Sequence, residues 1–256
     1  MQLCLSARMF TIPGERDQFD LEMDAFIQFA RAMGYDGITL RPGQLDSRTL
    51  PEEVDRISGM LIRNDMVCSF VMGETVGDRK SYEAHCELMD HALRIGCRHV
   101  QPSVRSASEI PWLQKLCDYA AEQGVRIGPQ LHNNTLHDTV PRCLDLLKKV
   151  DRKNFGLNFE ASHLLIQNVN PQGGKAVRAL GDRIFTVCVQ NYRMEGVHPI
   201  PCLPGDAEGV DFEDVFGTLK EIGFDGFVTH MSGRYPDMRN EDVCRAYVEA
   251  LRPLMT

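Results

Sequence analysis

The sequence predicts an α/β protein, and within that class a (β/α)8 barrel formed by a single domain over residues 1–256. Short runs rich in Val, Ile, Leu and Phe alternate with longer segments whose apolar residues recur at helical spacing. Eight such units fit into 256 residues, a typical length for one barrel. A Gly-aromatic-Asp-Gly turn occurs twice, at 34–37 and 223–226, as expected of a repeated βα unit.

Eight apolar runs are expected to be parallel strands, because strands covered on both faces are apolar throughout instead of alternating. They lie at 3–7, 37–41, 67–72, 99–103, 126–132, 155–160, 184–191 and 226–231. Stripes of apolar residues between them predict helices that pack one face against the sheet. The stripes run from Leu21 to Met33, Tyr82 to Leu93, Leu113 to Ala120, Val140 through Leu144 to Leu147, Phe212 to Leu219, and Val243 to Leu254.

The glycines between these elements support the same reading. Gly34 and Gly223 are expected to take the left-handed conformation that ends a helix, and Gly96 and Gly124 the same. An open doubly wound sheet is the alternative, but it would carry a Gly-rich phosphate loop after the first strand, and residues 6–10 contain no glycine. The Pro- and Gly-bearing stretch 198–209 is expected to be a long loop within the seventh unit.

Composition and charge narrow the class of function. The net charge of −8, without any Lys/Arg run, argues against nucleic acid as a partner. No stretch approaches the ~20 apolar residues of a membrane helix, and the N-terminal run is too soon interrupted by Arg8 to resemble a signal peptide. Nine cysteines without a Cys-x-x-Cys pair are expected to be mostly reduced, buried thiols, as in a cytoplasmic protein.

The chemistry of such a barrel is expected at the carboxyl ends of its strands. Alternation along a strand places Gln130 and His132 on one face, and Cys188 and Gln190 on one face. Seven residues at or just beyond the ends of the fifth to eighth runs could carry chemistry: Gln130, His132, Glu160, His163, Cys188, Gln190 and Met231.

These segments resemble a known family. Residues 155–163, Phe-Gly-Leu-Asn-Phe-Glu-Ala-Ser-His, are similar to the G-x-x-x-D-x-x-H segment of the xylose-isomerase-like TIM barrels, the sugar phosphate isomerase/epimerase group. Residues 34–42, 203–212 and 223–228 resemble further segments of that group. The resemblance covers nearly the whole chain. It implies an isomerase or epimerase of carbohydrate metabolism that binds a small sugar, polyol or sugar acid, and it leaves a homo-oligomer open.

The resemblance also implies a metal. Members that act on ketoses hold one Mn²⁺ or Mg²⁺ with Glu, Asp, His and Glu ligands, where this chain has Gln130, Glu160, Cys188 (or Gln190) and Met231. Two carboxylates are lost and a thioether suits a hard cation poorly, so we expect a degenerate metal site. Gln130 and Glu160 are the two groups that could still bind an ion. An unusual site suited to Zn²⁺ is the alternative, with ligands from Glu160, His132, His163 and Cys188.

Three residues are candidates for catalysis in place of that machinery: Glu160, His163 and His132. Each has a structural alternative: Glu160 as a carboxylate bonded to Arg or backbone groups, His163 as a helix cap, and His132 as a hydrogen-bonded pocket wall. The substrate pocket is predicted to include Gln130, Cys188, Gln190, Met231, Arg41 and Arg193.

Four arginines lie just after predicted strands and could bind a phosphate or carboxylate on the substrate: Arg8, Arg41, Arg105 and Arg193. Weak salt bridges at the rim are the alternative. Cys188 is expected to be a buried apolar group rather than a thiolate, and His230 to point away from the pore. A protein that binds a metabolite without turnover, or a metal-dependent lyase or isomerase with unusual ligands, remains an alternative to the metal-free enzyme.

Overall fold

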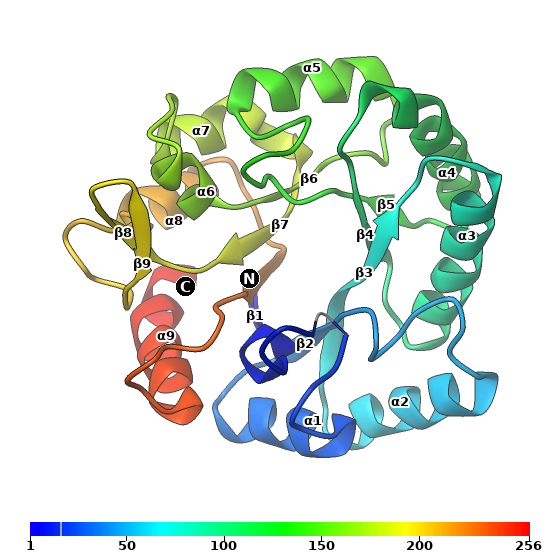
Figure 1. Ribbon diagram of the computed structural model, residues 1–256, viewed down its shortest axis with the longest axis horizontal. Coiled ribbons are helices and arrows are strands. Elements are labelled where there is room, and N and C mark those ends of the chain that lie inside the picture. The colour runs from blue at the N-terminus through cyan, green and yellow to red at the C-terminus, as the bar shows by residue number, and fades with distance from the viewer. Residues whose placement is uncertain (16) are drawn as a thin grey trace.

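Eight parallel strands form a ring that helices surround in the computed structural model, which describes residues 1–15 and 17–256 (Figure 1). Hydrogen-bonded neighbours follow the order β5-β4-β3-β2-β1-β10-β7-β6. The predicted α/β barrel is therefore confirmed. The strands are β1 (Gln2–Ser6), β2 (Gly37–Leu40), β3 (Val67–Thr75), β4 (His99–Ser103), β5 (Arg126–Ile127), β6 (Leu157–Phe159), β7 (Ile184–Val189) and β10 (Phe227–His230).

The ring closes between β5 and β6 through isolated bridges instead of a continuous ladder. Ile127 bridges Phe155, and Gln130 bridges Asn158. The fifth strand is shorter than the predicted run at 126–132, because Pro129 has no N–H to donate to a ladder. Its carbonyl still accepts from the Asn158 N–H at 3.0 Å, which keeps Gln130 at the mouth of the barrel.

Nine α-helices occur in the described part of the chain, and most cover the outside of the barrel (Figure 1). They are α1 (Met23–Ala32), α2 (Pro51–Arg63), α3 (Arg79–Arg94), α4 (Ile110–Glu122), α5 (Val140–Val150), α6 (Ala161–Ile166), α7 (Gly173–Leu180), α8 (Phe212–Glu221) and α9 (Asn240–Met255). The predicted stripes omitted α2, α6 and α7. The α2 helix nevertheless buries Val54, Ile57, Met60 and Leu61, an apolar face separated by charged residues.

Two local predictions were wrong. Leu144 is 43% exposed, because the buried face of α5 is centred on Cys143 and Leu147 and leaves Leu144 at its edge. The stretch 198–209 is not loop throughout, since β9 (His198–Pro201) pairs with β8 (Tyr192–Glu195) as an antiparallel hairpin. The predicted helix-ending turns are confirmed: Gly34 and Gly223 have φ values of +88° and +72°.

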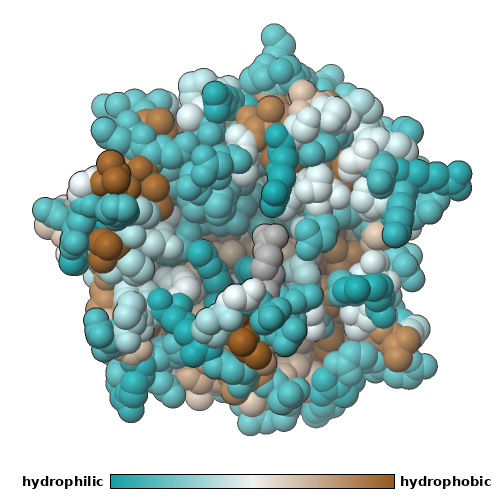
Figure 2. All heavy atoms as spheres, in the orientation of Figure 1, coloured by the Kyte–Doolittle hydropathy of each residue, from teal (hydrophilic) through white to brown (hydrophobic). Residues whose placement is uncertain are grey.

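The centre of the barrel contains polar pairs beside a small apolar cluster of Phe70, Cys188 and Met231, whereas the layer between strands and helices is apolar. Inside the barrel, the Ser69 hydroxyl lies 3.1 Å from that of Thr229, and Asn158 Nδ2 donates to Gln101 Oε1 at 2.6 Å. The face seen in Figure 2 is mostly hydrophilic, with hydrophobic residues in separate small groups. Among the described helices, none combines the length and apolar character needed to cross a membrane.

Candidate active site

Glu160 lies at the centre of a ring of hydrogen-bond donors. It follows β6, is fully buried, and does not use its side chain to cap α6. The amide nitrogens of Gln130 and Gln190 both donate to its carboxylate, and the Ser162 hydroxyl donates to Oε1 at 2.5 Å. His163 Nε2 lies 3.5 Å from the same oxygen. Side chains from the ends of three strands thus meet on one carboxylate.

The ring holds Glu160 as an anion. Burial by itself would raise the pKa, but His163 and the hydrogen bonds from Ser162 and Gln190 outweigh it and hold the pKa of Glu160 below its ordinary value. Burial lowers the pKa of His163 to about 4, against the opposing pull of Glu160, so its imidazole is neutral at pH 7. The hydrogen bonds from Ser162 and Gln190 and the positive charge of Arg8 thus add to the interaction with His163 in stabilising the charge of Glu160.

Gln190 links this carboxylate to Arg8. Its Oε1 accepts from Arg8 Nη1 at 2.8 Å and from the Tyr192 hydroxyl at 3.0 Å. These two contacts fix the amide so that its nitrogen faces Glu160. Arg8 Nη1 also donates to the Met231 carbonyl at 3.2 Å. A cation and an anion are thereby joined through one amide at the mouth of the barrel.

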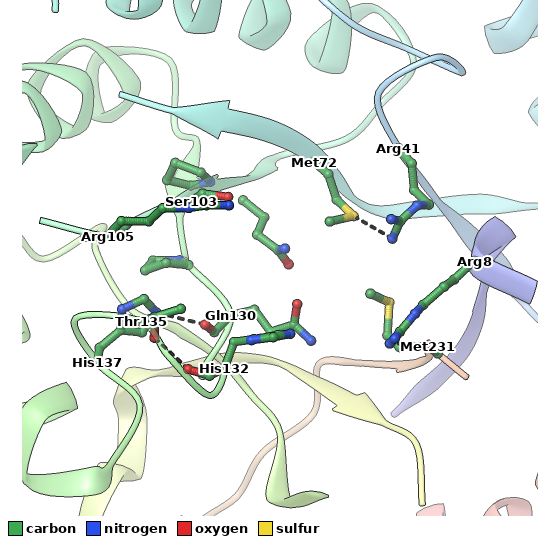
Figure 3. Close-up of a pocket in the computed structure, with 14 residues that line it drawn as sticks. Arg8, Arg41, Met72, Ser103, Arg105, Gln130, His132, Thr135, His137 and Met231 are labelled. Carbon is green, nitrogen blue, oxygen red and sulfur yellow. Dashed lines mark hydrogen bonds between the residues drawn. The ribbon is translucent and has the colours of Figure 1, made fainter. Parts of the chain in front are cut away.

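A cavity of about 260 Å³ opens beside this ring (Figure 3). Arg8, Arg41 and Arg105 contribute to its wall, together with His132 and Gln130. The side chains of Met72 and Met231 form an apolar part of the same wall. Figure 3 shows Arg8 and Arg41 extending into the space from one side, with Arg105 on the opposite side. The cavity borders the ring at Gln130.

His132 lies in the wall of this cavity. Its Nδ1 lies 2.8 Å from the Asn133 carbonyl oxygen, which can only accept, so Nδ1 carries a proton, and in the neutral tautomer the lone pair is on Nε2. The His132 ring packs against the His163 ring at a tilt of 42°, with 3.9 Å between centroids. The loop is further held by His137 Nε2, 2.8 Å from the Gln130 carbonyl.

The structure brings most of the predicted site residues together. Gln130, His132, Glu160, His163, Gln190, Met231 and Arg41 gather at the same end of the barrel. Cys188 packs below them against Phe70 and Met231, and burial raises the pKa of its thiol well above the ordinary value. Cys188 is thus an uncharged apolar contact rather than a thiolate.

Arg193 is not brought to the cavity. The β8–β9 hairpin carries it outward, where it pairs with Glu195 at 3.0 Å and with Asp206 at 3.4 Å. Three contributors were missed by the sequence reasoning: Ser162, Tyr192 and Gln101. Ser162 lies two residues after Glu160, and Tyr192 lies two residues after Gln190. This short distance from a predicted site residue is the one sequence signal that could have identified them.

The donors around Glu160 do not fit a divalent cation. The described residues contain no group of three or more His, Cys, Asp or Glu side chains that could hold a metal ion. The nitrogens of Gln130 and Gln190 face the carboxylate, and Oε1 of Gln190 is already bonded to Arg8 and Tyr192. A Mn²⁺ or Mg²⁺ ion needs several oxygen ligands free to coordinate. The residues of the Zn²⁺ alternative, Glu160, His132, His163 and Cys188, likewise do not form such a group in the described part of the chain.

Comparisons with known proteins agree with this architecture. L-ribulose 3-epimerase of Methylomonas sp. (strain DH-1) is 29% identical over 134 residues, covering 49% of this chain and 42% of that protein. The chain thus spans less than half the length of the curated relatives it matches.

Two solved structures share the fold. D-allulose 3-epimerase from Methylomonas sp., in complex with D-allulose, has a TM-score of 0.75 and 20% identity over 99% of this chain and 96% of that one. A xylose isomerase-like TIM barrel protein from Mycobacterium smegmatis, in complex with magnesium, has a TM-score of 0.77 and 14% identity over the same shares. Residues 27–254 also match the family model described as xylose isomerase-like TIM barrel. The chain therefore belongs to the xylose isomerase-like TIM barrel family.

Proposed function

We propose that this protein is an isomerase or epimerase of a small sugar, polyol or sugar acid, and that it transfers protons without a bound divalent metal. The observation that carries the proposal is the ring around Glu160, in which amide nitrogens occupy the carboxylate oxygens that a metal would need. The related L-ribulose and D-allulose 3-epimerases support the reaction class. The cavity at the carboxyl ends of the strands supports the place of binding.

His132 is the proposed base. Its Nε2 lone pair takes the proton from a carbon next to the substrate carbonyl, and the C–H electrons form a C=C bond while the carbonyl oxygen becomes an enolate. An isomerisation is complete when the hydroxyl proton on the deprotonated carbon moves to the enolate oxygen and the abstracted proton returns to the former carbonyl carbon, which leaves the carbonyl on the neighbouring carbon. Return of a proton to the opposite face of the deprotonated carbon completes an epimerisation and requires a second proton donor.

Arg8 is the proposed partner of the developing oxyanion. Its guanidinium lines the cavity, and its Nη1 donates to the neutral oxygens of Gln190 and Met231. A fixed cation beside the carbonyl stabilises negative charge that appears in the transition state. Glu160 then acts as a positioning residue: it orients both amides and balances the charge of Arg8 through Gln190.

Exchange with solvent deuterium tests this function. EDTA-treated protein is incubated in D₂O with a panel of small ketoses, aldoses and sugar acids, and NMR follows both deuterium incorporation and product. At least one substrate should exchange without added metal. His132→Gln should slow that exchange by about 10²–10⁴-fold. His198→Gln, an exposed histidine in β9, is the matched control and should leave the rate unchanged.

Other outcomes separate the alternatives. Turnover that EDTA abolishes and Mn²⁺ restores would contradict the metal-free mechanism. Full activity of His132→Gln would refute its role as base. Sugar binding with no exchange for any compound would instead identify a metabolite-binding protein without turnover.

A further inference from the structure

A second cavity, of about 640 Å³, adjoins the cavity of about 260 Å³ described above. We call the smaller one, which borders the ring at Gln130, the first cavity. The wall of the second cavity comes from the loops after β1 and β2, the end of β3 and helix α3. The two cavities share Arg41, Met72 and Ser103, so they lie side by side at the same end of the barrel.

Side chains form the boundary between the two cavities. Arg41 Nη1 lies 3.4 Å from the Met72 sulfur, a contact drawn in Figure 3. Arg41, Met72 and Ser103 are all half-buried, and a methionine side chain adapts its shape easily. Neither cavity is fully enclosed. A single ligand can therefore pass over these side chains and reach from the first cavity into the second.

The floor of the second cavity is uncharged. Gly73 and His85 both line it, and an added Cβ at Gly73 would collide with Nε2 of His85. The absence of a side chain at Gly73 thus lets the histidine of α3 lie against β3. Burial lowers the pKa of His85, so its imidazole is neutral at pH 7. Met72 and Leu88 add apolar surface, against which the C–H groups of a sugar ring can pack.

The rim of the second cavity offers acceptors and donors together. Glu15, Asp17 and Glu74 contribute carboxylates to its wall. Asp46 lines it as well and pairs with Arg48, with 2.9 Å between Oδ2 and Nη2. A hydroxyl group both donates and accepts, so it can bond to carboxylates and guanidinium groups alike. A second anionic group would instead be repelled by these carboxylates. The described wall therefore suits a neutral group that carries several hydroxyls.

We infer that the small sugar on which the protein acts is one unit of a larger neutral glycoside. The reacting unit occupies the first cavity, and a hydroxyl-bearing glycosyl unit attached to it occupies the second. This inference rests on the proposed function and deepens it, because it names the substrate class. The first cavity is smaller than the ~300–1,000 Å³ typical of ligand sites, whereas the second lies within that range.

Binding of matched monosaccharides and disaccharides tests the inference. Isothermal titration calorimetry on the full chain compares D-fructose with lactulose, turanose and isomaltulose, and D-glucose with maltose and cellobiose. At least one disaccharide should bind about ten-fold or more tightly than the monosaccharide it contains, since one or two charge-assisted hydrogen bonds to the second unit supply that difference.

Variants assign the added affinity to the second cavity. Ala84, on α3, lines the second cavity and not the first. Ala84→Phe fills that space and should lower the ratio of disaccharide to monosaccharide affinity by about ten-fold. Glu74→Gln keeps the size of an exposed side chain but removes its charge, and should lower the same ratio by about three- to ten-fold. It carries the test if Ala84→Phe does not fold. Ala121→Phe, at an exposed position of α4 outside both cavities, is the control and should leave the ratio unchanged.

The outcomes separate this inference from the proposed function. Disaccharides that bind no more tightly than their monosaccharides in every pair would overturn the extended site, and deuterium exchange into a monosaccharide would leave the proposed function standing. A disaccharide advantage that survives both Ala84→Phe and Glu74→Gln would also overturn the inference, since the second unit would then lie elsewhere. An advantage lost in both variants, without deuterium exchange into any compound, would support the extended site and contradict the proposed function.

Discussion

Replacing Glu160 by Gln tests whether the ring at the barrel mouth stabilises the fold. The substitution keeps the size of the side chain but removes the charge and one acceptor oxygen. The carboxylate now accepts from Gln130, Gln190 and Ser162. An amide in its place must turn its own N–H₂ toward one of these donors, because it has a single oxygen.

The cost follows from these contacts. One buried amide donor loses its acceptor, at about 1–3 kcal/mol, and the remaining hydrogen bonds lose their charge assistance. We expect a loss of about 2–4 kcal/mol in the free energy of unfolding. For a protein of this size that corresponds to a decrease in Tm of roughly 4–16 °C.

Thermal and urea denaturation of Glu160→Gln, at pH 7, measure this effect. Glu195→Gln is the matched control, because that carboxylate is 59% exposed and pairs with Arg193 on the hairpin. It should change the free energy of unfolding by no more than about 0.5 kcal/mol. A Glu160→Gln protein as stable as wild type, or more stable, would refute the reasoning. The desolvation free energy of the buried carboxylate would then equal or exceed the stabilisation that its hydrogen bonds provide.

Two further predictions concern stability. Burial lowers the pKa of His163 from 6.5 to about 4, so as the pH falls this histidine takes up a proton in the unfolded chain before it does in the folded protein. The free energy of unfolding therefore decreases as the pH drops from about 6.5 to 4. This histidine contributes about 3 kcal/mol to that loss, and His163→Gln should flatten the pH dependence measured by urea unfolding; an unchanged slope would contradict the assignment. Gly128→Ala should destabilise by about 1–3 kcal/mol, because an added Cβ would lie 2.6 Å from His99 Nε2. Gly217→Ala in α8, where an added Cβ meets nothing within 4 Å, should instead stabilise by about 0.5–1 kcal/mol, and equal Tm shifts for the two would rule out steric contact as the cause.

The predictable part of the site is the set of residues at strand ends. Glu160 and Gln130 lie at the carboxyl ends of neighbouring strands, so a barrel of known strand order necessarily brings them together. The unpredictable part is how they bond. Arg8 and Gln190 are 182 residues apart, and no local pattern indicates their contact. Arg193 follows β7 by four residues and Arg8 follows β1 by two, yet a hairpin turns Arg193 away from the cavity.

The sequence by itself determined the barrel, because each βα unit repeats a local rule: an apolar run, a helical stripe and a glycine such as Gly34 that ends the helix. These signals depend on residues within one or two turns of each other. The tertiary structure alone decided that the amides of Gln130 and Gln190 face Glu160 and that Arg8, Arg41 and Arg105 share a cavity. Those contacts arise only when the ring closes, since closure sets the distances between side chains that the sequence places far apart.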